Sequence, residues 1–244
     1  SSSYNKIMFS AYDKAGDVSY SIGAFPTVEL IKRRPEDVIG IALRSDLRMT
    51  DELAELLAPV REVTEVNDRA VSRVAKKGNA FIVGAFRKRY SAFPAGPHVA
   101  LVHPSDEGNL GTIMRTMLGF GMTGLAIVGE GSADAYNPKT VRASMGAIFA
   151  LDICLYPDWE SYARDRHEKK LLFMLDERSK TLGSVPAEGC ALVFGNEGEG
   201  LPPELADEGT PVVIRHSREI DSLNLPQAVA IGLYETTKHI FAEK

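Results

Sequence analysis

The side chains that could do chemistry gather in three short segments, two of which are rich in glycine. The segments read GNLGTIMRT at 108–116, GNEGEGLP at 195–202 and DSLN at 221–224. Glycine lets a ligand approach the backbone closely, while Arg115, Glu197 and the amides supply charge, donors and acceptors. This combination is typical of a pocket that reads its ligand largely through backbone groups and a few polar side chains.

Neither glycine-rich segment matches a phosphate-binding loop. The pattern G-x-G-x-x-G is absent, which argues against a nucleotide-dependent dehydrogenase. No Gly-Lys-Ser or Gly-Lys-Thr ends the second segment, and Glu197 and Glu199 would repel phosphate. An acidic, glycine-rich loop instead suits a cation or an uncharged adenosine. A surface turn before a helix opened by Pro202 and Pro203 explains the same composition equally well.

The first segment opens an amphipathic helix. Five apolar residues follow helical spacing and predict a stripe packed on a sheet: Leu110, Ile113, Met114, Met117 and Leu118. Asn109, Thr112, Arg115 and Thr116 fall on the opposite side. A solvated face would explain them, but a helix that starts at the end of a strand places Arg115 close to any ligand bound there.

The third segment begins another helix. Asn224 is expected to be the N-cap, with Pro226 in the first turn and Gln227 as its capping-box partner. Capping does not explain Asp221 or Ser222, and Asp221 is left without a role.

The elements that position these segments follow from continuous apolar runs, which are typical of strands covered on both faces. We predict strands at 99–102, 125–128, 153–156, 171–175, 191–194 and 212–214. The fold class is therefore α/β with a mostly parallel six-stranded sheet. Ligands of such sheets bind at the carboxyl ends of strands, so the loops after Val102, Phe194 and Ile214 are the candidate site.

The first part of the chain predicts a small α/β domain of its own. Helices are expected at 25–34, 50–57 and 68–77, and strands at 38–43, 60–63 and 81–86. The basic, proline-containing stretch that follows suits a linker. We expect domains at 1–86 and 99–244, joined by a linker at 87–98.

Composition narrows the function class further. The chain has 244 residues and a net charge of −5, which argues against a protein that coats nucleic acid but permits local basic patches. Basic clusters occur at 32–34, 76–77 and 87–89, although each alone is more often a solvated face. No apolar stretch is long enough to cross a bilayer and the start lacks a secretory pattern, so we expect a soluble, cytoplasmic protein.

Metal and disulfide chemistry are not expected. Cys154 and Cys190 each lie in an apolar run, where a reduced thiol behaves as a small hydrophobic group. The five histidines have no spacing that would join two of them as ligands, so we predict no metal site.

Taken together, the three segments resemble the SPOUT class of methyltransferases, and within it the SpoU or TrmH family of RNA ribose 2′-O-methyltransferases. The order and spacing agree across roughly 99–240, and VRASMGAIF at 141–149 is also similar to the family. The first part more loosely resembles a ribosomal-protein-like RNA-binding domain. The resemblance implies a C-terminal trefoil knot that holds S-adenosyl-L-methionine, and a homodimer acting on structured rRNA or tRNA.

Position by position, the resemblance implies roles for individual residues. Cofactor contacts would come from Gly195, Leu201, Ile214 and Leu223. The reaction centre would be shaped by Asn109, Arg115, Glu197, Ser222 and Asn224. A guanidinium is essentially always protonated, so we assign Arg115 to orienting the hydroxyl or a phosphate and leave the general base open. RNA would be bound by Lys32, Arg33, Arg34, Arg87, Lys88, Arg89 and Arg142.

Two departures from the family pattern bear on these roles. Arg215 and His216 follow Ile214 where relatives have Ile-Pro, which changes the backbone beside the cofactor and adds positive charge. The stretch KGNAFIVGAF at 77–86 replaces the usual His-Gln-Gly sequence, so the RNA target is expected to differ. The alternative to an enzyme is a non-catalytic RNA-binding or ribosome-assembly factor that retains the fold.

Overall fold

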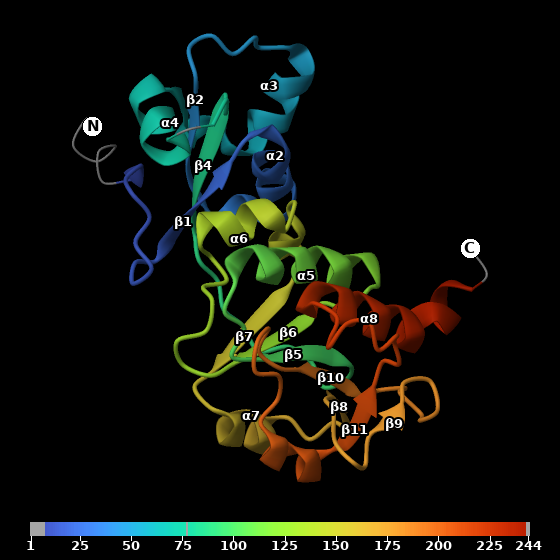
Figure 1. Ribbon diagram of the computed structural model, residues 1–244. Coiled ribbons are helices and arrows are strands. Elements are labelled where there is room, and N and C mark those ends of the chain that lie inside the picture. Colours follow the sequence, from blue (N-terminus) through green and yellow to red (C-terminus); the bar gives the residue numbers. More distant parts are fainter. Residues whose placement is uncertain (1–7, 77, 243–244) are drawn as a thin grey trace. The chain divides into compact units, whose positions relative to one another are not determined.

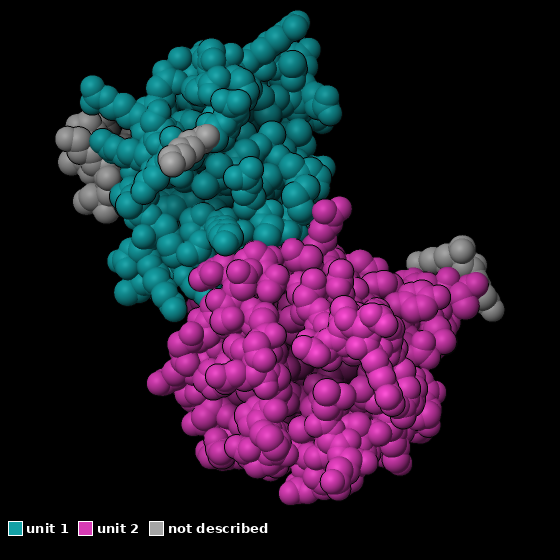
Figure 2. Space-filling model, in the orientation of Figure 1, with its two compact units in different colours: residues 1–89, 134–150 teal, residues 90–133, 151–244 magenta. Residues whose placement is uncertain are grey.

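The computed structural model describes residues 8–76 and 78–242 and contains two compact units. Unit 1 comprises residues 1–89 and 134–150, and unit 2 comprises residues 90–133 and 151–244 (Figure 2). No helix in the described part of the chain is both long enough and apolar enough to span a bilayer.

Unit 2 is built on a sheet of seven strands in the order β7-β6-β5-β10-β8-β11-β9 (Figure 1). Their bounds are β5 His98–Val102, β6 Gly124–Val128, β7 Asp152–Tyr156, β8 Lys170–Phe173, β9 Lys180–Thr181, β10 Ala191–Phe194 and β11 Thr210–Val213. Every neighbouring pair is parallel. The predicted α/β class with a parallel sheet is therefore confirmed.

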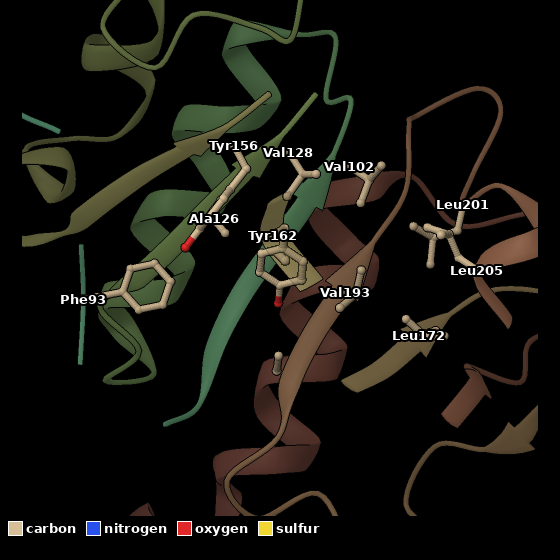
Figure 3. Close-up of a cluster of buried hydrophobic side chains, with 12 residues drawn as sticks. Phe93, Val102, Ala126, Val128, Tyr156, Tyr162, Leu172, Val193, Leu201 and Leu205 are labelled. Carbon is tan, nitrogen blue, oxygen red and sulfur yellow. The ribbon is translucent and has the colours of Figure 1, made fainter. Parts of the chain in front are cut away.

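Helices cover both faces of this sheet, which explains why its strands are continuous apolar runs. On one face lie α5 (Glu107–Gly119) and α8 (Leu225–Phe241), which pack against each other. On the other lie α7 (Trp159–Asp165) and the 3₁₀ segment η4 (Pro203–Glu208). Their residues Tyr162 and Leu205 join Val102, Val128 and Val193 in one buried cluster (Figure 3).

The predicted strand count and one strand end need correction. A seventh strand, the two-residue β9, pairs with β11 at the sheet edge. It is too short to leave an apolar run in the sequence. Strand β8 ends at Phe173 rather than at residue 175, and Leu175 is 78% exposed in the loop beyond it. An apolar side chain thus lies free at the carboxyl edge of the sheet.

The second half of the predicted linker, 87–98, is packed rather than free. Phe93 and His98 are buried, and the Arg166 guanidinium donates to the carbonyl oxygens of Phe93 (2.9 Å) and Pro94 (2.9 Å). His98 bonds through Nε2 to the Tyr162 hydroxyl at 2.6 Å and begins β5. This segment therefore belongs to the core of unit 2.

Unit 1 has a four-stranded sheet in the order β1-β4-β2-β3. The strands are β1 Val18–Ile22, β2 Val38–Leu43, β3 Thr64–Val66 and β4 Ile82–Arg87, and the helical segments are α2 Ala24–Arg33, η1 Pro35–Asp37, α3 Asp51–Leu57, η2 Ala58–Val63 and α4 Asp68–Ala75. Two predictions differ here. Residues 60–63 fall in the 3₁₀ segment η2, which has a kink at Val60, rather than in a strand, since Pro59 favours a helix start. Strand β1 was missed because serines alternate with its apolar residues.

Residues 134–150, which were expected in the second domain, belong to unit 1. They form α6 (Pro138–Ala143) and η3 (Ala147–Ala150). Arg34 holds them: its guanidinium donates to the carbonyl oxygens of Ile148 (3.3 Å) and Phe149 (2.9 Å) and to the Tyr136 hydroxyl (3.1 Å). The ring of Phe86 contacts the rings of Tyr136 and Phe149 edge-on. The compact units therefore do not follow the chain boundary near residue 87.

Candidate active site

The candidate site lies where four neighbouring strands end. Strands β5, β10, β8 and β11 are consecutive in the sheet and parallel. The loops that begin at His103, Gly195, Met174 and Ile214 therefore leave from the same edge, where ligands of parallel sheets bind. The loops after β10 and β11 contain the segments 195–202 and 221–224, and the loop after β5 leads into α5, which contains the segment 108–116. The loop after β8 contains Leu175.

The loop after β10 crosses itself at Gly195. Asn196 and Gly200 form an antiparallel bridge, with N···O distances of 3.3 and 2.9 Å. A Cβ atom on Gly195 would lie 2.1 Å from the carbonyl carbon of Gly200 and 2.2 Å from the amide nitrogen of Leu201. Since both obstacles are backbone atoms, only glycine fits at this crossing. Gly195 therefore allows the close passage of the two chain segments.

Asn196 and Glu197 tie this loop to the loop after β5. The Asn196 amide donates to the His103 carbonyl oxygen at 2.8 Å. The Glu197 carboxylate accepts from the backbone N–H groups of Ser105 (3.0 Å) and Asp106 (2.9 Å). These N–H groups immediately precede α5, where a negative charge is favoured by the helix dipole. The two loops thus form one rigid clasp, and the sequence had not assigned Asn196 to it.

Helix α5 begins at the clasp and presents its polar side to it. Asp106 is the N-cap and accepts from the Asn109 N–H at 2.7 Å. The Asn109 side-chain amide lies 3.5 Å from Glu197 Oε2, so these two predicted site residues are brought together. The apolar side of the helix is buried as predicted, except that Leu118 is half-buried.

Arg115 lies in the middle of α5 on its exposed side. Within residues 8–76 and 78–242 its guanidinium makes no hydrogen bond or ion pair. All five of its N–H donors therefore remain available to an external acceptor such as a phosphate or hydroxyl oxygen. The guanidinium therefore makes no polar contact that stabilises the described part of the fold.

The loop after β11 lines a cavity of about 380 Å³. Leu175, Val213, Ile214 and Ile220 supply apolar wall, and Asp221 lies at the same cavity. A larger hollow of about 840 Å³ shares Leu175, Val213 and Arg215 with it. These volumes lie in the range of ordinary small-ligand sites. Leu175 was missed as a site residue because it was taken for the end of a strand.

Arg215 and the start of α8 complete this edge. The Arg215 side chain donates to Thr181 Oγ1 at 2.9 Å, which anchors it between the two hollows. Asn224 is the N-cap of α8, as predicted, and accepts from the Gln227 N–H at 3.2 Å. Ser222 is exposed and Leu223 half-buried beside the cap.

The predicted cofactor residues occupy different environments in the structure. Ile214 lines the 380 Å³ cavity, whereas Gly195 supports the loop crossing. Leu201 is 5% exposed and its side chain belongs to the core cluster with Val193 and Leu205 (Figure 3). Its side chain is therefore part of the core, which leaves the backbone of Leu201 as the part that a cofactor could contact.

The predicted RNA-binding residues also differ in their burial and in their partners. Arg34 is 4% exposed and its donors serve unit 1, so its assignment to an RNA surface is wrong. The Lys88 ammonium group donates to the carbonyl oxygens of Asp13 and Lys14, and burial lowers the pKa of Lys88.

The other basic residues lie at the surface, and two of them are paired. Arg33 pairs with Glu29 at 3.1 Å. Arg89 pairs with Asp37 and Glu36. The remaining members of the predicted set are exposed: Lys32, Arg87 and Arg142.

The geometry agrees with the matches found among known proteins. The SpoU rRNA Methylase family matches residues 96–234, which is more than half of the chain. The chain belongs to the SpoU rRNA Methylase family. The resemblance seen in the three segments is thereby confirmed.

Individual relatives of this SpoU-family chain include the 23S rRNA (guanosine-2′-O)-methyltransferase RlmP of Bacillus subtilis, which is 30% identical over 133 residues. An uncharacterized tRNA/rRNA methyltransferase of Synechocystis is 29% identical over 141 residues. These alignments cover 53% and 56% of this chain and 53% and 51% of the relatives. The chain thus spans about half the length of the curated relatives it matches.

Solved structures extend the likeness over nearly the whole chain. The AdoMet-bound rRNA methyltransferase of Sinorhizobium meliloti superposes with a TM-score of 0.79 at 28% identity, covering 92% of this chain and 88% of that one. The SpoU methyltransferase AviRb of Streptomyces viridochromogenes gives a TM-score of 0.76 at 21% identity, covering 93% of this chain and 92% of that one, which supports the fold.

Proposed function

We propose that this chain is an S-adenosyl-L-methionine-dependent RNA ribose 2′-O-methyltransferase that acts on structured rRNA or tRNA. The observation that carries the proposal is the clasp of Asn196 and Glu197 on the start of α5, beside a cavity with apolar walls, in a SpoU-family chain. The similarity to the Bacillus subtilis 2′-O-methyltransferase supports the reaction, and the similarity to the AdoMet-bound Sinorhizobium meliloti enzyme supports the cofactor.

The residues present fit such a cofactor. The apolar walls at Leu175, Val213 and Ile214 suit an adenine ring, and the neighbouring Asp221 and Arg215 suit its charged and polar groups. We propose Ile214 and Leu223 as apolar contacts, with Gly195 and the Leu201 backbone acting through the shape of their loop. The bound cofactor supplies a methyl group on a positively charged sulfur.

The protein's own part in transfer is to position the ribose hydroxyl in line with that methyl group. We propose that Arg115 binds the hydroxyl or an adjoining phosphate, because its guanidinium is exposed and permanently charged. The Glu197 carboxylate accepts from the Asn109 side-chain amide and holds it beside the clasp. Ser222 and Asn224 at the start of α8 complete the proposed reaction centre.

Two further features of the family are proposed for this chain. We propose a C-terminal trefoil knot, which the insertion of β10 between β5 and the earlier β8 supports. We also propose a homodimer, which is supported by Ile231 and Tyr234 on α8, 40% and 57% exposed. The two residues are three apart and therefore share one side of the helix, and adjoining exposed apolar side chains indicate an interaction surface more strongly than single ones do. Sedimentation velocity measures the assembly.

Methyl transfer from labelled cofactor to total RNA tests the proposed reaction. The label should protect the modified ribose linkage from alkaline cleavage, because a methylated 2′-oxygen cannot attack the phosphate. Label on a base would exclude ribose chemistry. Cofactor binding in calorimetry without transfer to any RNA would favour a non-catalytic factor.

Replacing Arg115 tests its proposed role. We expect Arg115→Ala to lower kcat/KM by about 100-fold or more, which corresponds to the loss of roughly 3 kcal/mol of transition-state stabilisation. Its unfolding midpoint should match that of wild type, because the side chain has no partner in the described part of the chain. Arg164→Ala, a change of an exposed arginine on α7, serves as the control. Equal turnover of the two variants would remove Arg115 from the mechanism.

A further inference from the structure

We propose that unit 1 binds an unpaired stretch of RNA on the exposed side of α4 and on the Arg44–Phe81 pair next to it. We call this the α4 surface: Arg44, Arg69, Arg73, Lys76 and Phe81. The choice of RNA rests on the proposed function, whereas the position of the surface rests on the contacts of its own residues. It includes Lys76 of the 76–77 cluster but none of the residues that the resemblance had assigned to RNA binding.

Three exposed cations lie on α4 and at its end. Arg69 and Arg73 are four residues apart on the helix, so they project from the same side and are separated by about 6 Å along the helix axis. Lys76 is the C-cap residue, with a φ of 38°, and adds a third exposed cation where the helix ends. The opposite side, with Ala70 and Val71, is buried against the sheet. The helix is therefore fixed, and its charged side faces outward.

These three cations are not neutralised by the fold. Within residues 8–76 and 78–242, none of their side chains makes a hydrogen bond or an ion pair. The clusters at 32–34 and 87–89 differ, since Arg33 pairs with Glu29, Arg89 with Asp37, and Arg34 is buried. When an unpaired cation of the protein neutralises an RNA phosphate, the counterions condensed on the RNA are released. This release favours binding.

An exposed aromatic ring lies close to these cations. Phe81 is 39% exposed at the start of β4, and the Arg44 guanidinium lies 3.9 Å from the centre of its ring. The Arg44 N–H donates to the Phe81 carbonyl oxygen at 2.8 Å, so the backbone fixes the pair. The stacked guanidinium and ring together offer a flat surface of the kind on which unpaired bases stack.

Two backbone contacts place the pair next to α4. The Ser45 N–H donates to Asp68 Oδ1 at 2.8 Å, which joins the Arg44 loop to the first turn of the helix. Phe81 follows the end of α4 by six residues, and Gly78 turns back onto the Ala75 carbonyl oxygen. The nearby carboxylates are occupied, because Asp46 pairs with Arg44 and Asp68 with Ser45.

The combination favours single-stranded RNA over other anionic partners. Exposed cations alone would also suit an acidic peptide or a duplex, since both present regular negative charge. An aromatic ring contributes only where a base is free to leave its stack. We therefore infer a loop, bulge or single-stranded end of the substrate RNA.

The test uses the full chain, a fluorescent unstructured oligoribonucleotide and a duplex of the same length, with affinity measured over a range of salt concentrations. The first variant is Arg69→Gln/Arg73→Gln/Lys76→Gln. The second is Phe81→Ala. The matched control removes three exposed cations elsewhere: Arg61→Gln/Arg164→Gln/Lys169→Gln. Unfolding midpoints establish that each variant is folded.

The α4 triple variant should flatten the slope of log K against log salt by about 2, or roughly 0.7 per lost phosphate contact, and bind at least about tenfold more weakly. Phe81→Ala should weaken the single strand by about 5- to 150-fold without changing that slope. The control should bind as wild type. An unchanged slope in the α4 triple variant would overturn the surface.

Equal loss of duplex and single-strand binding in Phe81→Ala would overturn the choice of unpaired bases. Methyl transfer measured in parallel separates this proposal from the proposed function. If wild type methylates RNA while the α4 triple variant binds RNA and turns over normally, the proposed α4 surface is wrong and the proposed methyltransferase activity is supported. If wild type binds RNA through α4 but transfers no methyl group, the proposed activity fails and the surface stands.

Discussion

Gly195→Ala is expected to break the loop crossing on which the candidate site depends. The added methyl group would lie 2.1 Å from the Gly200 carbonyl carbon, whereas ordinary van der Waals contact begins at 3.4 Å. The backbone must therefore move by more than about 1 Å, since no side chain is available to yield. That movement pulls apart the two N···O contacts between Asn196 and Gly200.

The magnitude follows from the groups that must shift. Two lost backbone hydrogen bonds cost about 1–3 kcal/mol, and overpacking at a rigid site costs a further 1–3 kcal/mol. We expect a loss of about 2–6 kcal/mol in the free energy of unfolding. Cofactor affinity should fall as well, because Asn196 and Glu197 leave the start of α5.

Gly198→Ala is the matched control. A Cβ there would meet only Asn196 Oδ1 at 3.5 Å, and Gly198 has no left-handed backbone angle. Its stability should stay within about 1 kcal/mol of wild type. Urea unfolding and calorimetric titration with S-adenosyl-L-methionine compare the two variants. If Gly195→Ala matched Gly198→Ala in both measurements, the crossing would not constrain the site.

Two further predictions concern the buried polar groups. Arg34→Met should destabilise the protein by about 2–4 kcal/mol in urea unfolding, because it leaves buried acceptors unpaired, while Arg33→Met at the neighbouring exposed pair should cost under about 1 kcal/mol. Burial lowers the pKa of His98, so the unfolded chain binds its proton first and stability falls as pH drops below about 6.5. The loss at pH 5.5 should reach at most about 1.4 kcal/mol, and unfolding of His98→Gln should lack this dependence.

Much of unit 2 was predictable because its strands carry a local signal. The runs at 99–102, 125–128 and 191–194 are apolar throughout, and a strand covered on both faces requires that. The helix caps were equally local, since Asn224 bonds three residues ahead. Where the signal was weak, prediction failed. The serine-containing β1 and the two-residue β9 were both missed.

The candidate site was only partly predictable. Glycine, amide and charged residues marked the loops, but not the partners of each side chain. Asn196 and Leu175 went unassigned, because their roles arise from the loop after β5 and from the exact end of β8. The sequence also did not show that the Leu201 side chain packs in the core cluster with Val193 and Leu205.

The sequence by itself determined the parallel α/β fold of unit 2 and its three candidate loops, since apolar runs, glycines and caps act over a few residues. Only the tertiary structure decided which charged groups remain free. Arg34 and Arg33 are adjacent in a single basic run, yet Arg34 bonds to a carbonyl oxygen 115 residues away and Arg33 faces water. The cost of burying a charge depends on partners supplied by distant segments, and local sequence does not encode their positions.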